Sequence, residues 1–310
     1  MNISMGRSAR APAPKPLSDQ VVFLTGAAGG VGAEVAHRLH RKGTRLLLVD
    51  LDMVRLNELA ASLGEDRVMT AVADVRDLGA LQSAADRAVE RFGGIDTVVA
   101  NAGILSYGSV RQVDPLAFKR VLDVNVLGVF HTVRAALPSL IDRRGYILVV
   151  SSLAAYGGAP GLASYSASKA GVEHFANTLR LELAYLGVDV GSAHMALIDT
   201  PLLRDAKADL ATFREMLTMQ GPGNTVTSVQ DCGKAFVSGI EARKHRVNCP
   251  RWVGLARWLR PLLATPIGER SMSKSARELL PGLDAEVAAL GRSMGARSDL
   301  LTSAPEHPQG

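Results

Sequence analysis

The residues that decide the fold are Val21–Asp50, VVFLTGAAGGVGAEVAHRLHRKGTRLLLVD. Two short apolar runs, Val21–Thr25 and Arg45–Asp50, lie on either side of a helical pattern over Ala33–Lys42. Short apolar runs with little polar alternation are typical of strands buried on both faces of a parallel sheet. The stretch therefore predicts a strand–helix–strand unit with a right-handed crossover.

The turn between the first strand and its helix, Thr25–Gly32, reads TGAAGGVG. Glycines let the backbone turn sharply and approach a pyrophosphate, while the following helix offers free N–H groups at its first turn. Gly26, Gly30, Val31 and Gly32 are therefore candidate cofactor-binding residues. A tight structural turn is the alternative for the loop alone, but its place between a strand and a helix favours nucleotide binding.

Asp50 ends the second strand, where a carboxylate can accept both hydroxyls of an adenosine ribose and repel a 2′-phosphate. No Lys or Arg occupies the glycine turn or directly follows Asp50. This pattern predicts NAD rather than NADP as the cofactor. The alternative is that Asp50 or Asp52 only caps the next helix.

The alternation of strands and helices continues along the chain. Further strands are expected at Val68–Val72, Thr97–Ala100, Tyr146–Val150, Val188–Ala193 and His245–Cys249. Helices are expected at Leu78–Phe92, Asp114–Leu140, Ser164–Leu186 and Val229–Glu241. This rhythm predicts one α/β domain over residues 17–249, built on a doubly wound parallel sheet, with a substrate lid near residues 200–226.

Tyr165 and Lys169 are one helical turn apart, and Ser152 lies at the end of the preceding strand. An adjacent ammonium is expected to lower the pKa of the tyrosine, so that the phenol can exchange a proton near neutral pH. The serine hydroxyl would orient the substrate oxygen. This arrangement suits hydride transfer between an alcohol or ketone and a nicotinamide.

In these motifs the chain resembles the short-chain dehydrogenase/reductase family, from about Gln20 to Cys249. The glycine turn is followed in order by Asp74-Val75, by Asn101-Ala102-Gly103, by Asn125, and by Ser152 with Tyr165 and Lys169. The resemblance implies a Rossmann fold and a reaction that uses NAD or NADP.

The resemblance also implies roles for these residues. Ser152, Tyr165 and Lys169 would form the catalytic triad, and Asn125 would hold a water that relays protons to Lys169. Lys169 would also bond the nicotinamide ribose. The expected adenosine contacts are Asp74, Val75, Asn101 and Gly103.

One departure from the family pattern follows the sixth strand, where Met195-Ala196 replace the usual Pro-Gly. Ile198 and Thr200 still fit the positions that bind the nicotinamide carboxamide. The loop is therefore expected to have a different shape, because alanine restricts φ where glycine does not. The expected substrate pocket is apolar and comprises Leu153, Ala154, Ala155, Tyr156, Met195, Leu202, Leu203 and Phe213.

Composition excludes several classes of protein. The net charge of +5 arises at the two ends of the chain, which argues against a nucleic-acid-binding domain. No apolar stretch is long enough to predict a membrane span. Two cysteines, Cys232 and Cys249, form no disulfide framework, no metal site is expected, and the predicted location is the cytoplasm. Residues 1–16 are expected to be a disordered leader.

Residues 250–310 predict a helical extension with a polar tail. Trp252, Leu255, Leu259 and Leu262 share one face of a helix, and Arg257 and Arg260 lie outside that face. The apolar face could pack on the lid or on a neighbouring subunit, or it could rest on an anionic membrane. The apolar stripe of the helix after Tyr165 favours a homodimer or homotetramer.

The sequence thus predicts NAD-dependent oxidation of a secondary alcohol, or the reverse reaction, on a lipophilic steroid, terpenoid or fatty-acyl substrate. Two alternatives remain: an NADP-dependent ketoreductase of the same fold, and a membrane-recruited or non-catalytic binding protein.

Overall fold

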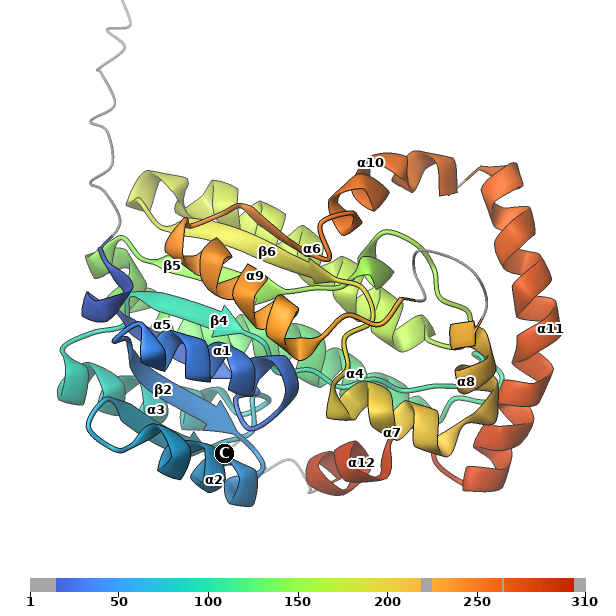
Figure 1. Ribbon diagram of the computed structural model, residues 1–310, viewed down its shortest axis with the longest axis horizontal. Helices are drawn as coiled ribbons and strands as arrows, with labels where there is room; N and C mark the ends of the chain where they lie inside the picture. Colours follow the sequence, from blue (N-terminus) through green and yellow to red (C-terminus); the bar gives the residue numbers. More distant parts are fainter. Residues whose placement is uncertain (1–14, 219–224, 264, 304–310) are drawn as a thin grey trace, which may run out of the picture.

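Seven parallel strands form one sheet in the order β3-β2-β1-β4-β5-β6-β7 in the computed structural model, which describes residues 15–218, 225–263 and 265–303 (Figure 1). The strands are β1 (Val21–Thr25), β2 (Arg45–Asp50), β3 (Val68–Val72), β4 (Thr97–Ala100), β5 (Tyr146–Val150), β6 (Asp189–Met195) and β7 (Arg246–Cys249). Helices cover both faces, so the predicted doubly wound fold is confirmed.

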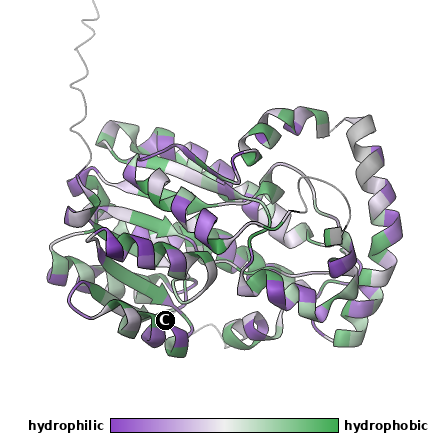
Figure 2. Ribbon diagram, viewed as in Figure 1, coloured by the Kyte–Doolittle hydropathy of each residue, from purple (hydrophilic) through white to green (hydrophobic). Residues whose placement is uncertain are grey.

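Two hydrophobic cores lie on opposite sides of the sheet, because every side chain of β1, β4 and β5 is buried. Figure 2 shows the apolar character of strands such as β2 and β4 inside the molecule. One core is covered by α1 (Gly30–Arg41), α2 (Met53–Leu63) and α9 (Val229–Glu241). The other is covered by α3 (Leu78–Phe92), α4 (Pro115–Leu122), α5 (Gly128–Arg143) and α6 (Ala163–Leu183).

The expected helix over Asp114–Leu140 is interrupted. A π-helical turn, η2 (Asp123–Leu127), separates α4 from α5 and carries Asn125. Such turns aim a side chain away from the regular helical register. The other short turns are η1 (Leu17–Asp19), η3 (Leu153–Ala155) and η4 (Ala184–Leu186).

Taken together, α4, η2 and α5 (Pro115–Arg143) are long and apolar enough to cross a membrane by length and composition alone. Half of their most apolar window is buried inside the fold, where Val129, Val133 and Ala136 pack in the hydrophobic core. We therefore interpret the stretch as a core helix of the domain.

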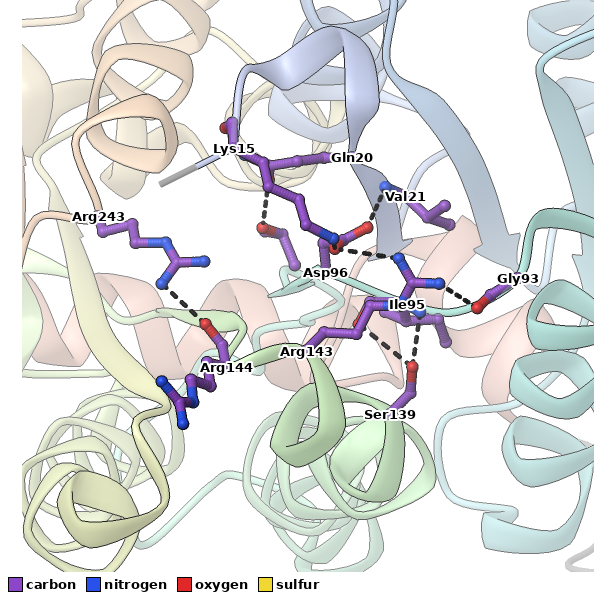
Figure 3. Close-up of polar contacts among 11 residues, drawn as sticks. Lys15, Gln20, Val21, Gly93, Ile95, Asp96, Ser139, Arg143, Arg144 and Arg243 are labelled. Atoms are coloured by element: carbon purple, nitrogen blue, oxygen red, sulfur yellow. Dashed lines mark hydrogen bonds and ion pairs between the residues drawn. The ribbon is translucent and has the colours of Figure 1, made fainter. Parts of the chain in front are cut away.

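A buried carboxylate closes the amino end of the sheet (Figure 3). Asp96 accepts a hydrogen bond of 2.9 Å from the Val21 backbone and pairs with Lys15 at 3.0 Å and Arg143 at 3.5 Å. These charge-assisted contacts satisfy the buried carboxylate and fix the start of β1. Of the expected leader, residues 1–14 lie outside the described residues.

The chain beyond β6 builds a lobe on one side of the sheet. Its helices are α7 (Pro201–Asp209), α8 (Ala211–Thr218), α10 (Val253–Leu263), α11 (Pro266–Leu290) and α12 (Ala296–Thr302). The first two occupy the expected lid, of which residues 219–224 lie outside the described residues. The extension runs from α10 along α11 and returns with α12 toward α2 and α7 (Figure 1).

Polar contacts hold α11 against the lobe. Asp284 accepts hydrogen bonds from the backbone and hydroxyl of Ser109 at 2.8 and 2.6 Å. Glu286 accepts equivalent bonds from Thr212 at 3.0 and 3.1 Å. The C-terminal extension is therefore docked on the domain along this helix.

Candidate active site

The carboxyl ends of the strands open into one cavity of about 840 Å³. The glycine turn, the end of β2, the triad and the lid all contribute to its wall. We call the part lined by the glycine turn, Asp50 and Asp74 the nucleotide half, and the part lined by the lid the substrate half. The two halves are continuous. The predicted cofactor and catalytic residues found in this wall are Gly26, Gly30, Val31, Asp50, Asp74, Val75, Asn101, Gly103, Ser152, Tyr165, Lys169, Ile198 and Thr200.

The glycine turn is shaped by close backbone packing. Gly26 has φ +64°, and a Cβ there would lie 2.7 Å from the Ala102 Cα. Gly32 does not contribute to the cavity wall, but a Cβ on it would lie 2.0 Å from the Gly26 carbonyl oxygen. The Asn101 amide donates to the Thr25 and Gly26 carbonyls at 3.1 and 2.9 Å and holds the turn in place.

Asp50 faces the nucleotide half of the cavity from the end of β2. Its carboxylate accepts hydrogen bonds from the backbone N–H groups of Ala28 (2.8 Å) and Asp52 (3.0 Å). Burial raises the pKa of this carboxyl, and the two backbone bonds oppose the rise. Asp52, which accepts from Arg55 N at 3.0 Å, is the residue that caps α2.

Asp74 and Val75 also contribute to the wall of the nucleotide half. The Asp74 carboxylate pairs with Arg76 at 2.6 Å and accepts from the Arg76 backbone at 2.8 Å. The carboxylate is therefore held in one orientation by the residue two positions along the chain.

The triad residues come from β5 and α6. The buried Lys169 ammonium donates to the Val150 carbonyl at 3.0 Å and lies 5.6 Å from the centre of the Tyr165 ring. Burial lowers the pKa of Lys169 to about 8. Ser152 accepts from the Ala154 backbone at 3.2 Å and hydrogen bonds to the Tyr165 phenol.

The expectation that Lys169 lowers the tyrosine pKa is wrong for this cavity. Burial raises the pKa of Tyr165, and the hydrogen bond from Ser152 is what opposes the rise. A phenol removed from water resists ionisation, because its phenolate loses hydration. Tyr165 is therefore a protonated donor here.

Asn125 lies behind the triad and not in the cavity wall. Its amide donates to the Ile104 carbonyl and to Ser168 Oγ, both at 2.9 Å, and its carbonyl accepts from Ile104 N at 2.8 Å. A Cβ on Gly103 would meet both Asn125 Oδ1 and Lys169 Nζ, at 3.3 and 3.4 Å. The residue thus holds the Gly103–Ile104 backbone beside the ammonium.

The substrate half of the cavity is apolar. The predicted residues that contribute to it are Leu153, Ala154, Tyr156, Met195, Leu202, Leu203 and Phe213. Ala155 instead packs with Tyr156 and Val253 in a small core and is absent from the wall. The Met195 sulfur lies 3.3 Å from the buried Cys232 thiol. The methionine that replaces the usual proline therefore packs against α9. Further apolar residues in the wall are Leu105, Leu162, Leu197, Met216, Trp252 and Ala256.

The sequence reasoning missed the far wall of the nucleotide half. Arg55 from α2 and four residues of α12 contribute to it. The α12 residues are Arg297, Ser298, Leu301 and Thr302. No local pattern places the end of the chain at this site, although Arg55 lies in the first turn of the helix that follows Asp50 and could have been proposed from that position.

Residues 20–211 match the family model described as short chain dehydrogenase. The chain belongs to this family. It is 34% identical over 214 residues to an uncharacterized NAD-dependent oxidoreductase of Mycobacterium tuberculosis, a match that covers 64% of this chain and 78% of that protein. It is 30% identical over 249 residues to the 11-beta-hydroxysteroid dehydrogenase 1A of Arabidopsis thaliana, a match that covers 76% of this chain and 70% of that protein.

Solved structures agree with this assignment. The short chain dehydrogenase of Mycobacterium paratuberculosis, bound to NAD, superposes with a TM-score of 0.66 at 28% identity and covers 76% of this chain and 97% of that chain. The protein is therefore an oxidoreductase of the short-chain dehydrogenase family with a nucleotide-binding Rossmann fold. The residues here fit a dinucleotide, since Gly26, Gly29 and Gly30 of the turn lie in one cavity wall with the Asp50 and Asp74 carboxylates.

If Lys169 bonds the nicotinamide ribose, as the family resemblance implies, its lowered pKa predicts that cofactor binding depends on pH. The ammonium is present below about pH 8 and is lost above it. NADH titrated by fluorescence should therefore bind about five- to tenfold more weakly as pH rises through this value, because a charged donor becomes neutral. In Lys169→Arg the guanidinium stays charged and this step should disappear. A wild-type affinity that is constant from about pH 6.5 to about pH 9.5 would contradict the role given to Lys169.

Proposed function

We propose that the protein transfers hydride between NAD(H) and a secondary alcohol or ketone. The observation that carries the proposal is the single cavity in which Tyr165, Ser152 and Lys169 share a wall with the glycine turn and Asp50. A non-catalytic binding protein of this fold would not need all three groups oriented in one cavity. The nicotinamide, when bound, supplies or accepts the hydride.

Side chains of this protein exchange the proton and orient the substrate oxygen. In the direction of reduction, the Ser152 hydroxyl orients the carbonyl oxygen and the Tyr165 O–H bond breaks as its proton passes to that oxygen. The high pKa of the buried phenol keeps this proton available. The Ser152 hydrogen bond stabilises the phenolate that remains, and Lys169, held by the Val150 carbonyl, lies 5.6 Å from the centre of the Tyr165 ring. Oxidation of the alcohol uses the same steps in reverse.

We infer NAD as the preferred cofactor because the Asp50 carboxylate faces the nucleotide half. The relative from Mycobacterium tuberculosis is named NAD-dependent, and the solved relative from Mycobacterium paratuberculosis holds NAD. NADP is the second candidate, favoured by one observation: the Arg55 and Arg297 side chains contribute to the same wall. Guanidinium groups are good partners for phosphate.

The substrate is proposed to be lipophilic. Leucine, methionine, phenylalanine and tryptophan side chains from the lid, α10 and the Leu105 region surround the space in front of the triad. Burial of apolar surface supplies most of the binding energy in such a pocket. The relative from Arabidopsis thaliana is named a hydroxysteroid dehydrogenase, which supports a steroid, terpenoid or fatty-acyl alcohol over a sugar.

The extension is proposed to rest on an anionic membrane. Trp252, just before α10, and Ala256 on α10 contribute to the cavity wall, while Leu255, Trp258 and Leu262 are exposed to solvent. The latter are spaced as one helix face, and α10 carries hydrophobic and hydrophilic residues along its length (Figure 2). Residues 243–278 hold nine Lys or Arg and two Glu, which favours an acidic lipid surface over a protein partner.

We further propose that the protein self-associates and is cytoplasmic. The exposed apolar side chains of Phe130 on α5 and Leu181 on α6 suit self-association as a homodimer or homotetramer. Location in the cytoplasm is consistent with two buried free thiols, Cys232 and Cys249. Nucleic acid is not expected as a partner. The described residues contain no group of three or more His, Cys, Asp or Glu that could hold a metal ion.

Tyr165→Phe tests the proposed chemistry. With a panel of lipophilic secondary alcohols and NAD⁺, kcat should fall ~10²-fold or more, because the proton exchange is lost. NADH affinity should stay within a few-fold, since the phenol holds little of the cofactor. Tyr185→Phe, at an exposed tyrosine, is the control and should keep wild-type turnover. More than a tenth of wild-type kcat in Tyr165→Phe would remove this residue from the acid–base role.

Asp50→Ala tests the cofactor preference. Loss of the carboxylate should weaken NAD⁺ binding by about 1.5–3 kcal/mol and improve NADP⁺ relative to NAD⁺. Asp50→Asn keeps a side-chain acceptor for the Ala28 and Asp52 backbones while removing the charge, so it separates recognition from local folding. If both variants keep the wild-type ratio of NAD⁺ to NADP⁺ affinities, Asp50 only shapes its own turn.

Trp258→Ala tests the membrane surface. Co-sedimentation of the full-length protein with vesicles of mixed phosphatidylglycerol and phosphatidylcholine should fall about tenfold, a loss of ~1.4 kcal/mol of apolar and interfacial binding. Binding of the wild type should also weaken with salt. Tyr185→Ala removes another exposed aromatic residue and should bind as the wild type does. An unchanged vesicle affinity together with a smaller oligomer would assign the stripe to a subunit interface instead.

A further inference from the structure

The last described helix returns to the nucleotide half of the cavity after the chain has crossed the substrate lobe. In Figure 1, α12 lies between α2 and α7. These two helices belong to opposite halves of the site, because α2 follows the Asp50 strand and α7 begins the lid. The C-terminal segment therefore returns to the cavity wall to which both the Asp50 turn and α7 contribute.

The segment before α12 is fixed to the domain. Met294 is buried in the main hydrophobic core and forms an antiparallel bridge with Ser106. The Ser293 carbonyl accepts from Tyr107 N at 2.8 Å, and Arg292 makes two bonds to Asp209 at 2.7 and 3.1 Å. This anchoring holds α12 at one position beside the cavity.

Two ion pairs then hold α12 itself. Asp299 pairs with Arg120 of α4 at 2.7 Å. Arg297 pairs with Asp52, whose backbone N–H donates to the Asp50 carboxylate at 3.0 Å. Arg297 is thus linked, through one residue, to the group proposed to bind the adenosine ribose.

The inward side of α12 forms part of the cavity. Arg297, Ser298, Leu301 and Thr302 contribute to the same wall as Asp50, Arg55 and Asp74. Thr302 is buried, so the end of the helix is packed and not merely laid on the surface. A nucleotide held between Asp50 and Asp74 would have α12 beside its adenosine half.

We propose that α12 completes the dinucleotide site as a clamp, and that the Arg297–Asp52 ion pair must open for the cofactor to leave. The proposal rests on the proposed function, because it assumes a nucleotide in this half of the cavity. Arg297 is a positioning residue: it acts by holding α12 against the Asp50 turn. The clamp predicts slow cofactor exchange that is governed by a partly exposed ion pair.

The test is the rate at which bound NADH leaves the full-length protein, followed by stopped-flow fluorescence after a chase with excess NAD⁺. Arg297→Gln should release NADH about fivefold faster or more, and Arg297→Lys should restore most of the wild-type rate. Asp52→Asn opens the pair from the other side and still offers an acceptor to cap α2. The double variant should be no faster than either single variant.

Ionic strength gives a second readout that a purely structural role would not produce. Salt should speed release from the wild type and leave Arg297→Gln unchanged, since the pair is partly exposed to solvent. Arg38→Gln is the matched control. It removes the Arg38–Glu34 pair on α1, whose side chains are 27% and 17% exposed against 27% and 16% for Arg297 and Asp52, and neither residue contributes to the cavity.

The outcomes separate the clamp from the function on which it rests. Wild-type release rates in both Arg297→Gln and Asp52→Asn would overturn the clamp and leave the proposed function standing. Equal acceleration by Arg38→Gln would also overturn it, because the effect would then be general loosening. A wild-type protein that binds neither NADH nor NADPH would overturn the proposed function and the clamp together.

Discussion

The site depends on one topological constraint. Parallel strands run outward in both directions from β1, with β2 on one side and β4 on the other, so their connections cross to opposite faces of the sheet. The two connections diverge at the carboxyl ends of β1 and β4 and leave a crevice there. Gly26 and Asn101 follow these strands and bond to each other across it. The Asp50 carboxylate and the triad of Ser152, Tyr165 and Lys169 are arranged around this crevice.

Much of this arrangement could be predicted from the sequence. Buried strands read as continuous apolar runs, and strand ends bring Asp50, Asp74 and Ser152 to one edge of the sheet. Helical spacing places Tyr165 and Lys169 on one face. The π turn at Asn125 could not be read, because a single extra residue in a helix leaves no clear pattern. The predicted direction of the Tyr165 pKa shift was also wrong, because burial of the phenol raises the pKa and the sequence does not show how deeply the side chain is buried.

The position of the C-terminal extension is the feature that the sequence predicted least well. Composition indicates an apolar helix with basic flanks. It does not indicate that the chain crosses the lobe and returns to the nucleotide half of the cavity. The contacts responsible are long-range pairs, Asp284 with Ser109 and Arg297 with Asp52, which no local pattern encodes. Through them the extension touches both halves of the cavity: α10 at the substrate end and α12 at the adenosine end. One added segment thus contributes to the cavity wall at both ends.

The central claim is that one continuous cavity lets hydride pass directly between an apolar alcohol and the nicotinamide. The most direct test uses lipophilic secondary alcohols that carry deuterium at the carbinol carbon, with NAD⁺, and locates the label by NMR. The account predicts one deuterium at C4 of the reduced nicotinamide and none in the solvent. If the protein binds the cofactor but no alcohol of the panel delivers its deuterium to that carbon, the assignment of this cavity to hydride transfer is contradicted.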